Sequence, residues 1–256
     1  MKRSRLPIYT IIAVLVFFYL PIAVLVANSF NASRYGGAWT GFSLKWYAQL
    51  IHEGVILRAL ANSLTIAVVA TVASTALGTL AAFALHRWRS RLQRAHYALI
   101  YAPLVMPEVL MGMGLLLLFV ALGLSLSLWT IFLAHVTFCI SYVALVVLAR
   151  LQDMDFTVIE AARDLGATRW QATRLVLLPM LWPGIAAGAL LAFTLSIDDF
   201  VITFFVAGAG STTLPIHIYS MIKHGSPPLI NALSTILLAA TFALVWLSRS
   251  LMEKEE

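Results

Sequence analysis

EAARDLGATRWQATRLVLLP, residues 160–179, is a polar and charged stretch inside a segment (151–182) that separates two long apolar runs. Thr157 and Glu160 have the Thr-x-x-Glu spacing of a capping box, which predicts that a short helix begins there. Gly166 is predicted to end this helix, because glycine adopts the left-handed backbone conformation of a helix C-terminus at little cost.

A second helix is predicted directly after this glycine. Thr168 and Gln171 repeat the spacing of a capping box. Pro179 is predicted to end the helix at Leu178, because a residue that precedes proline disfavours helical backbone. The segment is thus expected to form a helix, a glycine turn and another helix, which is more structure than a flexible tether needs.

The apolar runs on both sides of this segment are long enough to cross a lipid bilayer. Hydrophobic residues make up 61% of the chain and charged residues only 11%, whereas soluble domains carry about a quarter charged residues. A hydrocarbon core about 30 Å thick needs about 20 apolar residues in a helix. Six transmembrane helices are predicted, at residues 8–29, 62–86, 97–122, 129–150, 183–207 and 230–251. The expected fold is an all-α integral membrane protein with a single transmembrane domain over residues 1–256.

Lysine and arginine are distributed unevenly between the two sides of the membrane. With the N-terminus in the cytoplasm, the outer segments hold four of the 17 basic residues and the inner segments hold the other thirteen. Cytoplasmic loops carry such an excess, so both termini are expected in the cytoplasm. The net charge of +6 is explained by this topology and does not indicate a nucleic-acid partner. The first span is too long for the apolar region of a signal peptide, and we expect it to remain as an anchor.

Glu108 is an acidic residue inside the third predicted span. At 1.5 Å per residue it lies about 16 Å beyond Tyr97, near the membrane midplane. Pro103, Pro107 and Gly112 surround it and predict a broken or kinked helix, the kind of backbone that lines an aqueous route. Because a carboxylate inside a span is costly and usually faces a cavity, Glu108 is a candidate for a substrate path.

Asp198 and Asp199 lie towards the outer end of the fifth predicted span. Thr194 shares a helix face with Asp198, and Thr203 shares one with Asp199, so the four residues form a candidate polar stripe along the path. Neither acid-bearing span contains a lysine or arginine, and embedded negative charge without a counter-ion suits a polycation. In an alternative interpretation, one aspartate caps a helix or pairs with a partner subunit.

The segment quoted first resembles the EAA loop of ABC importer permeases. That loop has the pattern Glu-Ala-Ala, three residues, glycine, nine residues, an aliphatic residue, one residue, Leu-Pro, and here the aliphatic residue is Val176. In that family the first short helix is the coupling helix, which docks on the ATPase subunit. The resemblance implies that this role belongs to Glu160, Ala161, Ala162, Asp164, Leu165, Gly166 and Pro179. Glu160 taken alone is equally compatible with a simple helix cap.

The resemblance covers almost the whole chain and is strongest to the permease subunits of spermidine/putrescine ABC transporters. It is carried by NSFNASRYG, APLVMPEVLMG, HVTFCISYV, LAFTLSIDDFVITFF and LPIHIYS, which begin at residues 28, 102, 135, 191 and 214. The stretch SPPLINAL departs from the family pattern, which has an acidic residue near Leu229. The resemblance implies half of a polyamine pore in the bacterial inner membrane. The implied partners are a second permease, an ATPase dimer and a periplasmic substrate-binding protein.

Motifs of an enzyme are absent from the sequence. It contains no Gly-x-x-x-x-Gly-Lys-Ser/Thr loop, so ATP is expected to be bound by a partner, and we predict no catalytic residue, cofactor or metal. Its single cysteine, Cys139, excludes an internal disulfide. The alternatives are an importer permease for another small solute, or a stand-alone proton-coupled transporter. The second is disfavoured because such transporters tend to contain internal repeats, and the two halves of the chain show no convincing similarity.

Overall fold

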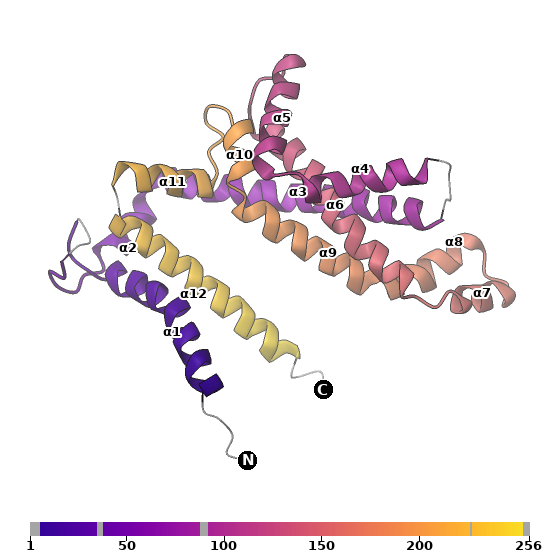
Figure 1. The fold of residues 1–256 in the computed structure, drawn as a ribbon, viewed down its shortest axis with the longest axis horizontal. Helices are drawn as coiled ribbons and strands as arrows, with labels where there is room; N and C mark the ends of the chain where they lie inside the picture. The colour runs from indigo at the N-terminus through magenta and orange to yellow at the C-terminus, as the bar shows by residue number, and fades with distance from the viewer. Residues whose placement is uncertain (1–5, 35–37, 88–91, 226, 253–256) are drawn as a thin grey trace. The chain divides into compact units, whose positions relative to one another are not determined.

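The computed structural model describes residues 6–34, 38–87, 92–225 and 227–252, although the side chains of residues 6, 7, 227 and 243–252 are not described. The described chain is helical apart from loops and an isolated bridge between Asn31 and Phe42 (Figure 1). This confirms the all-α fold, in which each helix satisfies its own backbone hydrogen bonds, as a lipid environment requires. The elements are α1 (Leu6–Ser29), α2 (Lys45–His52), α3 (Gly54–Arg87), α4 (Gln93–Val105), α5 (Glu108–Ala121), α6 (Leu128–Gln152), α7 (Thr157–Asp164), α8 (Arg169–Ala172), a π-helical turn η1 (Thr173–Leu177), α9 (Leu178–Asp198), α10 (Val201–Val206), α11 (Leu214–His224) and α12 (Pro227–Met252).

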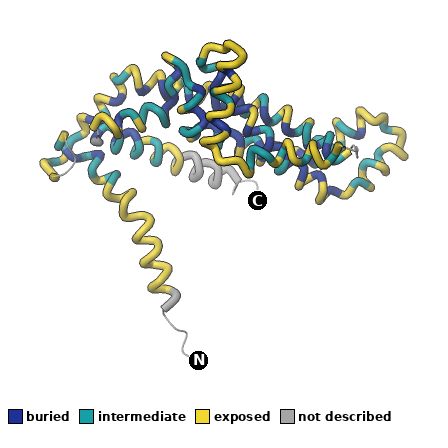
Figure 2. The backbone as a smooth tube through the Cα atoms, turned by 45° about the horizontal axis from the view of Figure 1, so that its top comes forward, coloured by how far each residue is buried: buried dark blue, intermediate teal, exposed yellow. Residues whose placement is uncertain are grey.

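The chain divides into two compact units, and each is described by itself. The first comprises Met1–Leu57 and His217–Glu256, where α12 contacts both α1 and α2. Most of α1 is exposed (Figure 2), as expected for an apolar helix that faces lipid or a partner. The prediction of a single domain over residues 1–256 stays a prediction.

The second unit, Arg58–Ile216, is built around α6, whose side chains are mostly buried. This helix packs closely along α9 because α9 presents glycines to it. A Cβ atom at Gly184 would lie 2.9 Å from the Arg150 side chain, and one at Gly188 would lie 3.3 Å from Val143. The two glycines thus let the helix backbones approach each other, which is how small residues act in membrane bundles.

The described residues include four helices long and apolar enough to cross a membrane, and a bent helix pair that counts as a fifth span. The pair is α4 and α5, which meet at 111°. Met106 has extended backbone (ψ 134°) because it precedes Pro107. The predicted break in the third span is therefore confirmed. The sixth predicted span corresponds to α12, of which the described apolar part is Pro228–Phe242.

The topology with both termini in the cytoplasm stays a prediction, and several of the basic residues on which it rests have side chains outside the described residues. These are Lys2, Arg3, Arg5, Arg89, Arg91, Arg249 and Lys254.

The fifth span differs from its prediction at both ends. It was expected at residues 183–207, but a continuous helix runs through Arg169–Asp198 and breaks at Asp199. The prediction that Pro179 ends a helix at Leu178 is wrong. Instead η1 precedes this proline, and the N–H of Leu178 donates to the carbonyl of Thr173 in the wider π register. Pro179 thus lies just after η1, in the first turn of α9 and inside the continuous helix.

The helix pair of the segment 151–182 is present, with one correction. Thr157 is the first residue of α7 and does not cap it; its N–H donates to the carboxylate of Asp155 over 2.9 Å, which lowers the pKa of Asp155. The second capping box is confirmed, because the Thr168 hydroxyl accepts from the N–H of Gln171. Gly166 follows α7 with a φ of +92°, as predicted for the end of that helix.

Candidate functional site

A cavity of about 530 Å³ lies in the second unit, where two helices are broken. One break separates α4 from α5 and the other separates α9 from α10. The cavity is lined by Pro103, Leu104, Met106, Pro107, Glu108, Met111, Phe138, Tyr142, Leu195, Asp198, Asp199, Phe200, Val201 and Ile202. The three acidic residues singled out in the sequence thus meet at one place, although Glu108 precedes Asp198 by 90 residues in the sequence.

Glu108 and Asp198 are the accessible acids of the cavity. Glu108 is the first residue of α5, where a negative charge interacts favourably with the helix dipole. Asp198 is the last residue of α9. Both residues are exposed, and neither forms an ion pair within the described part of the chain. Their carboxylates are therefore available to a ligand or a partner.

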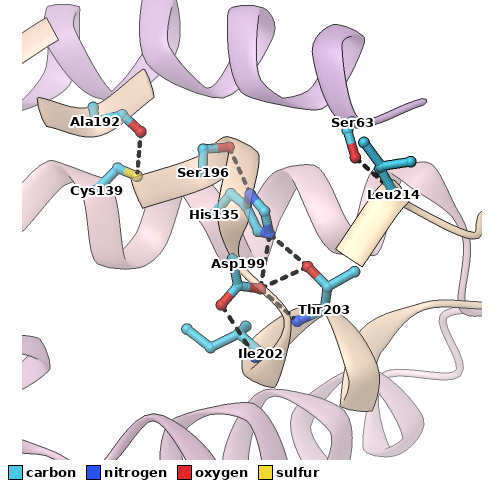
Figure 3. A network of polar contacts seen from close by, with 9 residues as sticks. All are labelled: Ser63, His135, Cys139, Ala192, Ser196, Asp199, Ile202, Thr203 and Leu214. Carbon is cyan, nitrogen blue, oxygen red and sulfur yellow. Dashed lines mark hydrogen bonds and ion pairs between the residues drawn. The ribbon is translucent and has the colours of Figure 1, made fainter. Parts of the chain in front are cut away.

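Asp199 differs from its neighbour because its side chain is only 6% exposed. One carboxylate oxygen accepts from the N–H of Ile202 over 3.3 Å. The other accepts from the N–H and the hydroxyl of Thr203, over 2.8 and 2.6 Å, and lies 3.4 Å from Nε2 of His135. This carboxylate is thus occupied by groups of the protein itself (Figure 3).

His135, on α6, is a further member of this polar cluster and forms hydrogen bonds between helices. Its Nδ1 lies 2.7 Å from the hydroxyl of Ser196, and its Nε2 lies 2.9 Å from the hydroxyl of Thr203. Ser196 belongs to α9 and Thr203 to α10, so one imidazole contacts both sides of the break (Figure 3). We define Ser196, Asp199, Thr203 and His135 as the His135 cluster.

The two threonines of the predicted stripe do not line the cavity. Thr194 is exposed, and its hydroxyl donates to the carbonyl of Leu190 within α9 over 2.9 Å. Thr203 is fully buried in the His135 cluster. The cavity instead presents aromatic rings, those of Phe138, Tyr142 and Phe200.

The predicted coupling residues do not line this cavity. They belong to α7 and to the residues that follow it. No residue of α7 is buried, and Leu165, directly after it, is 90% exposed. A concavity beside α7 is lined by Glu160, Arg163, Asp164, Ala167, Thr168 and Arg169. A short helix without a fully buried residue, next to an exposed leucine, is typical of a docking element. Ala161 is exposed, Ala162 is half-buried, and Pro179 is exposed at the start of α9.

Comparison with known proteins shows the family. Residues 74–253 match the family model of the binding-protein-dependent transport system inner membrane component. The chain is 44% identical to the putrescine transport system permease protein PotI of Escherichia coli, with 99% of this chain and 93% of that protein covered. It is 41% identical to the spermidine/putrescine transport system permease protein PotC of Haemophilus influenzae, with 93% of each covered.

Solved structures share the fold at lower identity. A bacterial ABC transporter involved in the import of the acidic polysaccharide alginate superposes with a TM-score of 0.77 at 19% identity, over 98% of this chain and 94% of that one. The MetNI methionine ABC transporter in an inward-facing conformation superposes with a TM-score of 0.62 at 19% identity, over 82% and 97%. Fold, family model and relatives agree that this chain belongs to the inner-membrane components, or permeases, of binding-protein-dependent ABC transport systems.

Proposed function

We propose that the chain forms one half of the translocation pore of an ATP-driven importer whose solute is a polyamine, such as putrescine or spermidine. The observation that carries the proposal is the gathering of Glu108, Asp198 and Asp199 at one cavity between two broken helices. Carboxylates inside membrane spans are costly and mark the routes of ions and substrates. The names of the relatives PotI and PotC, which state putrescine and spermidine transport, support the same solute class.

The chemistry of the cavity suits a flexible organic cation. A polyamine carries ammonium groups separated by methylene segments. The carboxylates of Glu108 and Asp198 are placed to accept charge-assisted hydrogen bonds from ammonium groups, while Leu195, Met111 and other apolar side chains contact the methylenes. The rings of Tyr142 and Phe200 add surfaces that attract cations.

The remaining parts of the proposed importer are other chains. ATP is bound and hydrolysed by an ATPase dimer, since this sequence has no phosphate-binding loop. Through α7, with Glu160, Asp164 and Leu165, the chain docks on that ATPase. A second permease completes the pore in the inner membrane, and both termini lie in the cytoplasm. A periplasmic substrate-binding protein delivers the solute. A related alginate transporter has been solved together with its periplasmic protein, which supports this kind of partner.

The proposal is tested by purifying the chain from its native membrane in mild detergent and identifying by mass spectrometry what accompanies it. An ATPase, a second permease and a solute-binding protein are expected, together with ATP hydrolysis that putrescine or spermidine stimulates through the binding protein. The same partners with hydrolysis stimulated only by another solute would refute the polyamine assignment. A chain recovered without an ATPase, under conditions that preserve a known importer, would favour proton-coupled transport through Glu108.

Replacing Glu160 by alanine is expected to weaken coupling between ATP hydrolysis and transport. Glu160 lines the concavity beside α7 and is exposed there, so the substitution removes a charge from the docking surface without disturbing a core. The loss of one charged hydrogen bond to the ATPase, about 1.5–3 kcal/mol, corresponds to about tenfold or more in uptake. The ratio of solute imported to ATP hydrolysed measures the effect. Glu53→Ala, in the first unit, is the control, and normal coupling in Glu160→Ala would contradict the docking role.

A further inference from the structure

We infer that His135 and Asp199 form a closed structural pair that fixes the break between α9 and α10, and that the two carboxylates left to bind the transported cation are those of Glu108 and Asp198. His135 is accordingly a positioning residue, which acts on the solute site through the broken helix. This inference rests on the proposed function and divides the neighbouring aspartates, which the sequence presents as equivalent, into one that binds solute and one that shapes the site.

The first step is the occupancy of the Asp199 carboxylate. Its two oxygens face four protein groups, which are the N–H groups of Ile202 and Thr203, the hydroxyl of Thr203, and Nε2 of His135. With a side chain 6% exposed, little of it reaches the cavity. An ammonium group that bound there would have to displace these donors and leave them buried without partners, which costs more than a single hydrogen bond returns.

The second step is the direction of the hydrogen bonds. The Thr203 hydroxyl has one proton and donates it to Asp199 over 2.6 Å. The same oxygen lies 2.9 Å from Nε2 of His135, so Nε2 carries a proton and donates it. In the neutral imidazole, Nδ1 then has no proton and accepts a hydrogen bond from the hydroxyl of Ser196. Each contact thus has a donor and an acceptor, and the imidazole connects α6 to the helix before the break and to the helix after it (Figure 3).

The third step is what this arrangement does to Asp198. The helix ends at Asp198, and the backbone of Asp199 is extended (φ −61°, ψ 123°). Consecutive side chains therefore point in different directions, with Asp199 inward to His135 and Asp198 exposed. Asp198 lines the cavity together with Glu108. If the His135 cluster is lost, the break is no longer fixed and the carboxylate of Asp198 loses its placement.

The transport test compares two neighbouring substitutions in the assembled importer, with radiolabelled putrescine as the probe. Asp198→Asn is expected to raise the half-saturation concentration about tenfold or more, because it removes a charge-assisted contact to the cation. Asp199→Asn keeps the shape of the side chain and one acceptor oxygen in the cluster, and because it removes no contact to the cation it is expected to change half-saturation about threefold or less. An equal rise in both variants would overturn the division, because it would show that Asp199 also binds the cation.

Substitutions of His135 test its positioning role. His135→Phe replaces the imidazole by an aromatic ring without nitrogen atoms and so removes both hydrogen bonds, and it is expected to raise the half-saturation concentration about tenfold. His135→Gln, which supplies a donor near Thr203, is expected to restore half-saturation to within about threefold of the native value. Normal putrescine uptake in His135→Phe would overturn the role of His135.

A second readout needs no transport and separates the failure of this inference from the failure of the proposed function. Asp198→Cys is labelled with a cationic methanethiosulfonate in a Cys139→Ser background, since Cys139 is the single native cysteine and is buried. The labelling rate is expected to change about fivefold or more when His135→Phe is added and less than about twofold with His135→Gln. An unchanged rate with His135→Phe would refute the positioning role even if putrescine is not the solute. If the labelling rates change as expected but the assembled importer does not transport putrescine, the proposed function is refuted and the positioning role of His135 stands.

Discussion

Polyamine uptake is expected to fall about 100-fold or more when Glu108→Gln and Asp198→Asn are combined. Each substitution removes one charge-assisted hydrogen bond to an ammonium group, worth about 1.5–3 kcal/mol, and every 1.4 kcal/mol is a factor of ten. Both residues line the same cavity and are exposed to it, so neither substitution leaves a buried group unpaired. The protein is therefore expected to fold and assemble normally while the cation binds poorly.

The measurement is the concentration dependence of radiolabelled putrescine uptake, with the amount of assembled complex and its basal ATP hydrolysis determined in the same preparation. Thr194→Val is the matched control on α9, because Thr194 is exposed, donates its hydroxyl to the carbonyl of Leu190 within its own helix and does not line the cavity. We expect the control to transport normally. Native uptake in the double variant would exclude this cavity from the path, whereas a strong loss in Thr194→Val would extend the path beyond it.

Much of the fold follows from short-range rules. The first, second and fourth spans are single apolar helices, and their predicted ranges lie within α1, α3 and α6. The break in the third span was predictable because Pro107 acts on the backbone of the residue directly before it. The second capping box was predictable because it is also a local interaction. Thr168 and Gln171 are three residues apart, and their hydrogen bonds need no other part of the fold.

The break in the fifth span was not predictable by such rules, because residues 198–200 contain neither proline nor glycine. The break is stabilised by the Asp199 carboxylate, which accepts from the first N–H groups of α10, and by His135, which is 61 residues from Ser196 and 68 from Thr203 in the sequence. A similar limit applies to Pro179. Its effect on the helix depends on the π register of the preceding turn, which the sequence pattern does not indicate.

The acids of the candidate site could be found from the sequence, but their division could not. Glu108, Asp198 and Asp199 stand out because charged residues are rare in apolar runs. Which of two consecutive aspartates faces a cavity depends on the local backbone direction and on a histidine from another helix. The sequence predicted that the acids have no counter-ion, because neither of their two spans contains a lysine or arginine. That prediction did not consider His135, which reaches Asp199 from another helix, α6.

The strongest effect on folding is expected from Gly208→Ala, in the loop two residues after the end of α10. A Cβ atom at this position would lie 1.8 Å from the carbonyl oxygen of Leu126 and 3.0 Å from the N–H nitrogen of Ser127. These are backbone atoms of the segment that connects α5 to α6, so no side-chain rotation relieves the overlap. Overpacking of this kind costs about 1–3 kcal/mol when side chains can adjust, and occasionally more. We therefore expect a cost of about 4 kcal/mol or more, in the range that only severe core defects reach.

The expected result is little or no monodisperse Gly208→Ala protein in size-exclusion chromatography, and a markedly lower thermal unfolding temperature in any that is recovered. Gly114→Ala is the control. Gly114 lies inside α5 with nothing within 4 Å of the added atom, and alanine in a helix interior is about 1 kcal/mol more favourable than glycine. If Gly208→Ala folds as stably as the control, the close approach of the two backbones is wrong. The placement of α10 would then be wrong as well, and with it the contacts of Thr203 to Asp199 and His135, because α10 carries Thr203 only a few residues before Gly208.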